Sequence, residues 1–370
     1  MLFRSVRDEK GAKMSKSKGN VVDPLGIIDD YGADALRFTL ARGAALGHDI
    51  RLSPQSVEVN RNFATKLWNA ARFVEFNGAG RVAGFDPRSA NEILNRWIAH
   101  ETAKATREVT EAIQQYKFNE AADAAYRFVW NVYCDWYVEL SKPLLTGPDG
   151  AAKDETRATA AWALDEILKL LHPFMPFITE ELWRVTAETG PKRDAMLVLA
   201  PWPTHDGLDD AKAEAEIGWL IDLVTAIRSV RVEMNIPAST PIPVVLAGAS
   251  AETQARAGRW EDFAKRLARV AGITFADAAP QGSVQLLIRG EVAALPLKGV
   301  IDLDAERVRL NKELQKAEAD IKRVDAKLGN PNFVANAPEE IIDGEREKRE
   351  EAEGRRQKIL EALERLKSAK

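Results

Sequence analysis

Close to the N-terminus the sequence reads Lys13-Met14-Ser15-Lys16-Ser17-Lys18-Gly19-Asn20. Three lysines alternate here with small or hydroxylated residues, and glycines at positions 11 and 19 flank them. Nothing in the run repeats at the period of a helix or a strand, so it predicts a mobile loop. Ammonium groups beside hydroxyl donors suit a polyphosphate, but a solvated basic linker has the same composition. Composition alone leaves both interpretations open.

The residues that follow the loop decide between these two interpretations. After Asp23-Pro24 the chain continues into Tyr31-Gly32-Ala33-Asp34-Ala35-Leu36-Arg37. Together with Lys-Met-Ser-Lys-Ser at 13–17, this run resembles the signature loop of the class I aminoacyl-tRNA synthetases, which are ligases of protein biosynthesis. Within that class the sequence resembles the valyl-tRNA synthetases (valine–tRNA ligases), and the resemblance runs from this loop to a C-terminal coiled coil.

The resemblance implies a two-step reaction, in which valine attacks the α-phosphate of ATP and the valyl group then moves to tRNA(Val). ATP is a substrate in this reaction, accompanied by Mg²⁺, and the loop would bind its phosphates. By their place in the motif, Lys13 and Lys16 are the candidate catalytic residues, and Lys16 is assigned the main contact with ATP. Ser15 and Ser17 are assigned as nucleotide-binding donors. Four scattered histidines and a single cysteine predict no metal site.

A second function remains open because of what the sequence does not contain. These synthetases carry their nucleotide-binding fold, their His-Ile-Gly-His motif and their editing domain ahead of the loop, and none of these is in this sequence. Valine and ATP would be held through that missing catalytic portion, so we expect the chain by itself to be inactive. The alternative is an isolated, non-catalytic module for tRNA binding or assembly. A search of the neighbouring upstream reading frame for His-Ile-Gly-His discriminates between the two.

The composition is that of an ordinary soluble protein, with 45% hydrophobic and 29% charged residues and a net charge of −4 over 370 residues. A tRNA partner must therefore be contacted through local basic patches. Cys134 stands among aromatic residues, which predicts a buried thiol, and one cysteine excludes a disulfide framework. No run of about 18 apolar residues occurs. We expect a cytoplasmic monomer without membrane contact.

The periodicity of apolar residues predicts a mainly α fold. Residues 90–190 have the pattern of a helical bundle, and strand-like runs after residue 242 enclose one helix, as in a small α/β unit. The expected regions are, in order, the end of a class I catalytic domain with the loop at 1–52, a helical anticodon-binding domain at 53–205, the small α/β unit at 206–300, and an antiparallel coiled-coil tRNA-binding arm at 301–370.

Local signals predict where individual elements begin. Residues 2–8 alternate apolar and charged side chains, which favours a strand. Ser53-Pro54 predicts an N-cap followed by the first helical residue. One aromatic-rich helix is expected at 118–141, and Thr179 is the expected cap of the helix that follows two prolines. The apolar period of residues 211–233 predicts a further helix.

The C-terminal region has a heptad pattern from residue 301 to Leu328, and Gly329-Asn330-Pro331 breaks the helix before a second one begins near 339. Two helices of similar length with a short connection should fold back antiparallel. Acidic and basic residues are nearly balanced, so the default interpretation is a solvated hairpin. The resemblance implies an arm that contacts the tRNA backbone through a subset of its basic residues: Lys312, Lys316, Lys322, Arg323, Lys327, Arg355 and Arg356.

Overall fold

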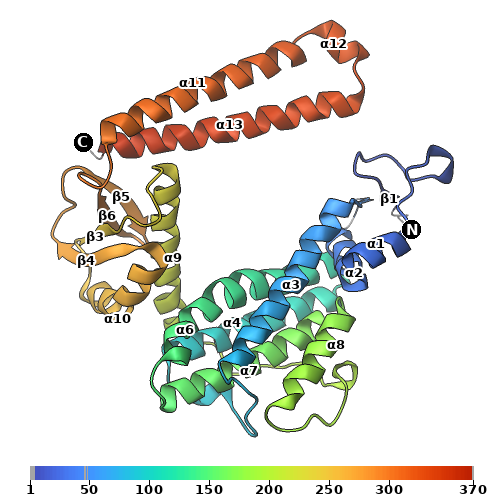
Figure 1. Ribbon diagram of the computed structural model, residues 1–370, viewed down its shortest axis with the longest axis vertical. Coiled ribbons are helices and arrows are strands. Elements are labelled where there is room, and N and C mark those ends of the chain that lie inside the picture. Colours follow the sequence, from blue (N-terminus) through green and yellow to red (C-terminus); the bar gives the residue numbers. More distant parts are fainter. Residues whose placement is uncertain (1–4, 46, 48, 369–370) are drawn as a thin grey trace. The chain divides into compact units, whose positions relative to one another are not determined.

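The computed structural model describes residues 5–45, 47 and 49–368. The fold is mainly α, as predicted, and it divides into two compact units, Met1–Ile217 and Gly218–Lys370 (Figure 1). Among the described residues, no helix is both long and apolar enough to cross a membrane.

The first unit begins with the loop and its immediate support. Strand β1 (Val6–Arg7) pairs in parallel with β2 (Ile50–Arg51), and the loop, α1 (Pro24–Tyr31) and α2 (Ala33–Gly43) lie between them in sequence. The strand predicted at 2–8 is thus limited to two residues, and positions 2–4 lie outside the described residues. A small apolar cluster that includes Ile27, Leu36 and Val57 packs against Met14 of the loop. The loop is therefore attached to a hydrophobic core by its own methionine.

Helix α3 (Pro54–Phe76) begins where the sequence predicts it. The Ser53 hydroxyl accepts a hydrogen bond from Ser56 N at 3.1 Å, and the Ser56 hydroxyl in turn accepts one from Ser53 N at 3.2 Å. This reciprocal pair satisfies two backbone donors that would otherwise have no partner, so it fixes the first turn.

The rest of the first unit is a helical bundle, and its aromatic-rich segment differs from the single predicted helix. The bundle helices are α4 (Ile93–Gln114), α5 (Phe118–Arg127), the π-helical segment η3 (Phe128–Tyr137), α6 (Val138–Thr146), α7 (Ala151–Leu171) and α8 (Pro176–Val185). Tyr133 and Tyr137 lie four residues apart in η3 and are both fully buried, and their hydroxyls donate to Ala160 O and Asn95 Oδ1 at 3.1 Å.

The cap predicted at Thr179 is wrong. Helix α8 begins at Pro176, and Thr179 is buried inside it, where its hydroxyl donates to Met175 O at 2.8 Å. The carboxylate of Asp34 in α2 accepts hydrogen bonds from Phe177 N at 3.2 Å and Ile178 N at 2.6 Å. The capping group therefore comes from a residue more than 140 positions away, which the pattern around the helix cannot reveal.

Helix α9 (Ala211–Glu233) crosses the division between the two units, and its bounds match the predicted helix. The second unit contains a four-stranded sheet of order β4-β3-β6-β5, in which β3 and β4 are parallel and the other pairs are antiparallel. Its elements are β3 (Ile242–Ala247), α10 (Ala251–Ala268), β4 (Val270–Ala276), β5 (Ser283–Ile288) and β6 (Glu291–Pro296). The small α/β unit is thus present.

The C-terminal hairpin consists of α11 (Leu303–Leu328), α12 (Pro331–Asn336) and α13 (Glu339–Ser368), and its two long helices are antiparallel (Figure 1). Buried small and branched residues such as Ala317, Val324 and Ala352 form its seam. Ion pairs between the helices keep the register, because partners late in α11 meet residues early in α13. Among the described residues they include Lys327–Glu345 at 3.2 Å, Arg349–Asp325 at 2.6 Å, Arg355–Asp320 at 3.7 Å and Arg356–Glu318 at 3.7 Å.

Candidate functional site

Asn20 closes the lysine loop. Its amide nitrogen donates to Asp8 Oδ2 at 2.7 Å, and its amide oxygen accepts from Ser15 N at 2.9 Å. Asp8 also accepts from Ala12 N at 2.7 Å. The hydrogen bond from Asn20 is the main reason why the pKa of Asp8 lies below its usual range. One asparagine therefore joins the end of the loop to its start.

Neither Asp8 nor Asn20 was assigned a role from the sequence. Asn20 belongs to the quoted motif, and an amide can donate and accept at the same time. A polar residue with both capacities directly after a turn glycine is the signal that could have identified it.

The lysines of the loop are presented to solvent. Residues Lys16–Lys18 form a single 3-10 turn that ends at Gly19, whose φ of +67° favours glycine. The side chains of Lys13, Lys16 and Lys18 are exposed, and among the described residues no carboxylate forms an ion pair with them. The hydroxyls of Ser15 and Ser17 lie 3.2 Å apart. The structure thus brings the two predicted serines together, beside cations that are available for a polyanion.

A second set of polar contacts holds the base of the loop. The Arg7 guanidinium pairs with the Asp49 carboxylate and donates to Gly11 O at 3.0 Å, while Ser5 N donates to Asp49 Oδ1 at 2.9 Å. The hydrogen bonds from Ser5 and Arg7 lower the pKa of Asp49 to about 2. Asp49 directly precedes β2, so these contacts fix both ends of the segment that carries the loop.

Helix α2, which follows the loop, is clamped to the bundle. Besides the Asp34 contacts, Arg37 donates from Nε to Phe174 O at 3.3 Å and from Nη2 to Pro173 O at 3.2 Å. Burial raises the pKa of Asp34, and the N–H groups of Ile178 and Phe177 oppose that rise. A carboxylate at the N-terminus of α8 also interacts favourably with the helix dipole. The two motif residues therefore hold both sides of the turn before α8.

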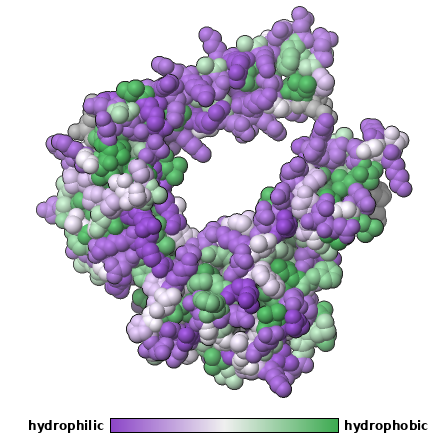
Figure 2. Space-filling view, in the orientation of Figure 1, coloured by the Kyte–Doolittle hydropathy of each residue, from purple (hydrophilic) through white to green (hydrophobic). Residues whose placement is uncertain are grey.

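The surface of the hairpin is hydrophilic over most of the face in view (Figure 2). All seven basic residues proposed from the sequence have exposed side chains. Lys316, Arg355 and Lys358 line a depression of about 340 Å³ between α11 and α13, together with Glu313. Glu313 is paired with Arg309 at 2.6 Å and Arg355 with Asp320 at 3.7 Å, so the cations of the depression outnumber its one carboxylate, which already has a partner. This arrangement suits a phosphate group.

Cys134 is a buried thiol, as predicted. Burial raises its pKa to about 12. A thiol in this state is a poor nucleophile, because the thiolate is the reactive form.

Three ranges of the chain match known protein families. Residues 2–53 match the family of class I tRNA synthetases for isoleucine, leucine, methionine and valine, and residues 95–246 match the anticodon-binding domain of tRNA ligases. Residues 302–367, the hairpin, match the tRNA-binding arm of valyl-tRNA synthetases. The chain belongs to the valine–tRNA ligase family. The matched ranges cover the lysine loop, the bundle and the hairpin in the expected order.

Individual valine–tRNA ligases are similar over nearly the whole chain. The enzyme of Rhodopseudomonas palustris is 65% identical over 98% of this chain, and that of Caulobacter vibrioides is 54% identical over 98%. The enzyme of Brucella suis is 53% identical over 100% of this chain. The chain spans only 40–41% of the length of these relatives.

Among solved structures, a leucyl-tRNA synthetase of Agrobacterium radiobacter in a ternary complex with tRNA and LeuAMS is similar at a TM-score of 0.45 and 19% identity. The similarity covers 71% of this chain and 29% of the synthetase.

Proposed function

We propose that this chain acts as the C-terminal segment of a valine–tRNA ligase, which binds the phosphates of ATP through its loop and docks tRNA(Val) for ATP-dependent charging. The observation that carries the proposal is the lysine loop itself. Its exposed cations are held on a frame built by Asn20 and Asp8, within the range that matches class I synthetases. In this proposal, the residues that hold valine and adenine belong to the part of the relatives that this chain does not span.

In the first reaction step, a carboxylate oxygen of valine attacks the α-phosphorus of ATP, and the bond to the β-phosphate oxygen breaks to release pyrophosphate. Negative charge grows on the phosphates in the transition state, so a positioned cation accelerates the step by electrostatic stabilisation. We assign this role mainly to Lys16, with Lys13 as the second cation and Ser15 and Ser17 as hydrogen-bond donors.

Mg²⁺ would reach the site on the phosphates of ATP. The exposed polar side chains between Lys13 and Lys18 are ammonium groups and hydroxyls, and the nearby carboxylate of Asp8 is already engaged by Asn20 and Ala12 N. Magnesium is usually bound through substrate phosphates with one or two carboxylates. The loop therefore fits the nucleotide anion better than it fits the metal ion.

Replacement of Lys16 tests the proposal in a full-length enzyme that carries this segment. Lys16→Ala should lower kcat for valine-dependent ATP–pyrophosphate exchange by about 100- to 1,000-fold, the usual cost of one transition-state donor. The KM for valine should change little. Lys192→Ala, which removes an exposed lysine far along the chain, is the matched control. Unchanged turnover with only a raised KM for valine would contradict the assignment of Lys16.

The bundle and the hairpin supply the proposed tRNA contacts. In this proposal residues 53–205 act as the anticodon-binding domain, residues 206–300 as the small α/β unit, and residues 301–370 as the arm. Contacts of the arm with phosphates position the tRNA and carry no sequence information, because every nucleotide has the same backbone. The arm therefore assists docking, and anticodon preference depends on the bundle.

One measurement distinguishes the second candidate function, a tRNA-binding module without catalysis, from the ligase function. A polypeptide of residues 1–370 should bind tRNA and show no valine-dependent ATP–pyrophosphate exchange, because the loop alone cannot hold valine or adenine. Restoration of exchange on addition of the remaining part of the enzyme supports the ligase. We also propose that the full-length enzyme is a monomer and lies in the cytoplasm. Sedimentation of the full-length enzyme tests the oligomeric state.

A further inference from the structure

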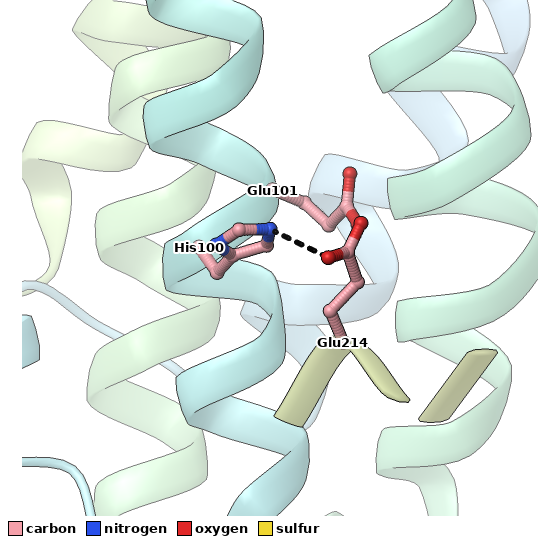
Figure 3. Close-up of side chains that lie close together, drawn as sticks. All are labelled: His100, Glu101 and Glu214. Carbon is pink, nitrogen blue, oxygen red and sulfur yellow. Dashed lines mark ion pairs between the residues drawn. The ribbon is translucent and has the colours of Figure 1, made fainter. Parts of the chain in front are cut away.

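Three potential metal-ligating side chains meet in the first unit, away from the lysine loop in sequence. His100 and Glu101 come from α4, and Glu214 comes from the first turn of α9 (Figure 3). One ligand atom from each side chain lies within 4.8 Å of the other two. Neighbouring residues on a helix point about 100° apart. Glu214 approaches from a separate helix, so it can meet both side chains.

His100 supplies an independent sign that the cluster takes a ligand. Only 7% of this residue is exposed, and its Nε2 atom is buried without a hydrogen-bond partner. That atom faces Glu214 Oε2 at 3.7 Å (Figure 3). The separation is too long for a hydrogen bond. Two donors of one tetrahedral zinc ion, each about 2.0–2.1 Å from the metal, lie about 3.4 Å apart.

The other ring nitrogen of His100 has a carboxylate within reach. Asp210 N donates to Nδ1 at 3.1 Å, and Asp209 Oδ1 lies 3.7 Å from the same nitrogen. Ligation through Nε2 requires the proton to be on Nδ1. The contact with Asp210 N is then given up. Asp209 Oδ1 is the nearest carboxylate oxygen, and it would have to move closer to Nδ1 to accept that proton, as carboxylates commonly do beside metal-binding histidines.

Glu214 keeps an oxygen free for a metal ion. Lys104 Nζ lies 3.5 Å from Glu214 Oε1, while Oε2 is the atom that faces the imidazole. Glu101 adds a second carboxylate to the same space. Imidazole nitrogens and carboxylate oxygens are both donors that zinc accepts, and the imidazole favours a transition metal over Mg²⁺ or Ca²⁺.

We propose that His100, Glu101 and Glu214 bind one divalent cation of the zinc class, with water as the fourth ligand. This site lies outside the proposed ATP and tRNA chemistry and differs from the sequence-based expectation of no metal site. A bound ion would fasten the first turn of α9 to α4, because its ligands come from both helices.

Direct metal binding tests the site. The chain is freed of metal with a chelator and titrated with Zn²⁺ by calorimetry and by competition with a chromophoric chelator. The wild type should bind one equivalent of Zn²⁺. His100→Gln and Glu214→Gln should each weaken that binding at least tenfold, because replacing even a residue that only hydrogen-bonds to a metal ligand typically lowers metal affinity by about tenfold or more. Glu111→Gln, an exposed glutamate on the same helix, is the matched control and should bind as the wild type does.

Two further measurements keep the proposal falsifiable if a variant is unstable. Zn²⁺ should raise the melting temperature of the wild type, since a ligand that binds the folded state stabilises it. X-ray absorption of the zinc complex should show one imidazole and otherwise oxygen ligands. Sulfur in the coordination shell would place the metal at Cys134 and refute the proposal. Equal, weak binding by the wild type, His100→Gln and Glu214→Gln would mean that Zn²⁺ binds elsewhere on the chain and not at this cluster, and would also refute the proposal.

Discussion

Asp34→Ala should release the start of α8 from α2, because the Asp34 carboxylate is the acceptor for two N–H groups in the first turn of α8. Ile178 N donates to Asp34 at 2.6 Å, and loss of this hydrogen bond leaves the Ile178 N–H unsatisfied at a cost of about 2–3 kcal/mol. The hydrogen bond from Phe177 N is longer, and water can replace the carboxylate because the phenylalanine is exposed. Loss of this second hydrogen bond therefore costs about 0.5–1 kcal/mol. The expected destabilisation is about 3 kcal/mol in total.

Hydrogen exchange measures this loss where it occurs. A local change of about 3 kcal/mol corresponds to roughly 150-fold faster exchange, since 1.4 kcal/mol is a factor of ten. The amides of Phe177 and Ile178 should show it, while amides of β3 in the second unit should not. In a melting experiment the first unit should lose about 6–12 °C, because domains of this size shift about 2–4 °C per kcal/mol.

Asp30→Ala is the matched control, since it removes an exposed carboxylate from the neighbouring helix α1. It should leave exchange at residues 177–178 and the melting temperature unchanged. The reasoning is refuted if Asp34→Ala leaves the exchange rate of Ile178 within threefold of the wild type.

Three other predictions concern the loop and the arm. Asn20→Ala should open the loop and increase the rate of tryptic cleavage after Lys16 and Lys18 at least tenfold. Asn336→Ala, in the C-terminal hairpin, is the control and should leave that rate unchanged. Equal cleavage of both variants would show that Asn20 does not order the loop. Because the pKa of Asp49 is lowered to about 2, its contribution to stability is present above its usual pKa near 4 and is lost as pH falls toward 2; a carboxyl titration by NMR with a midpoint near 4 would contradict this. Replacing Lys316, Arg355 and Lys358 together with glutamine should weaken tRNA binding and reduce the slope of log K against log salt by about 2. The control replaces three basic residues paired within their own helices, Arg307, Arg346 and Lys367, and equal slopes in both triple variants would make the hairpin a structural strut.

Much of the fold could be predicted because its signals are local. Ser53 and Pro54 specify the start of α3 through bonds within one turn, and the apolar period of residues 211–233 matches α9 residue for residue. The heptads after residue 301 likewise specify a hairpin, because two helices with one apolar seam each and a short connection can bury those seams against each other.

The candidate site was predicted only in part. The motif identified Lys13, Lys16, Ser15 and Ser17 as a group, and the structure places the two serines in contact on an exposed turn. The motif did not show that Asn20 and Asp8 form the frame, because hydrogen-bond partners inside a loop depend on its backbone path, which no periodic pattern encodes.

By itself, the sequence determined the lysine loop, the helical bundle, the small sheet and the antiparallel arm, since each depends on residue types within a few turns of one another. The tertiary structure alone decided which distant groups meet. Asp34 caps α8 and Glu214 faces His100 only because packing brings separate helices together. Pairing over more than 100 residues of chain leaves no spacing in the sequence, because it is fixed by how buried helix faces fit and not by local periodicity.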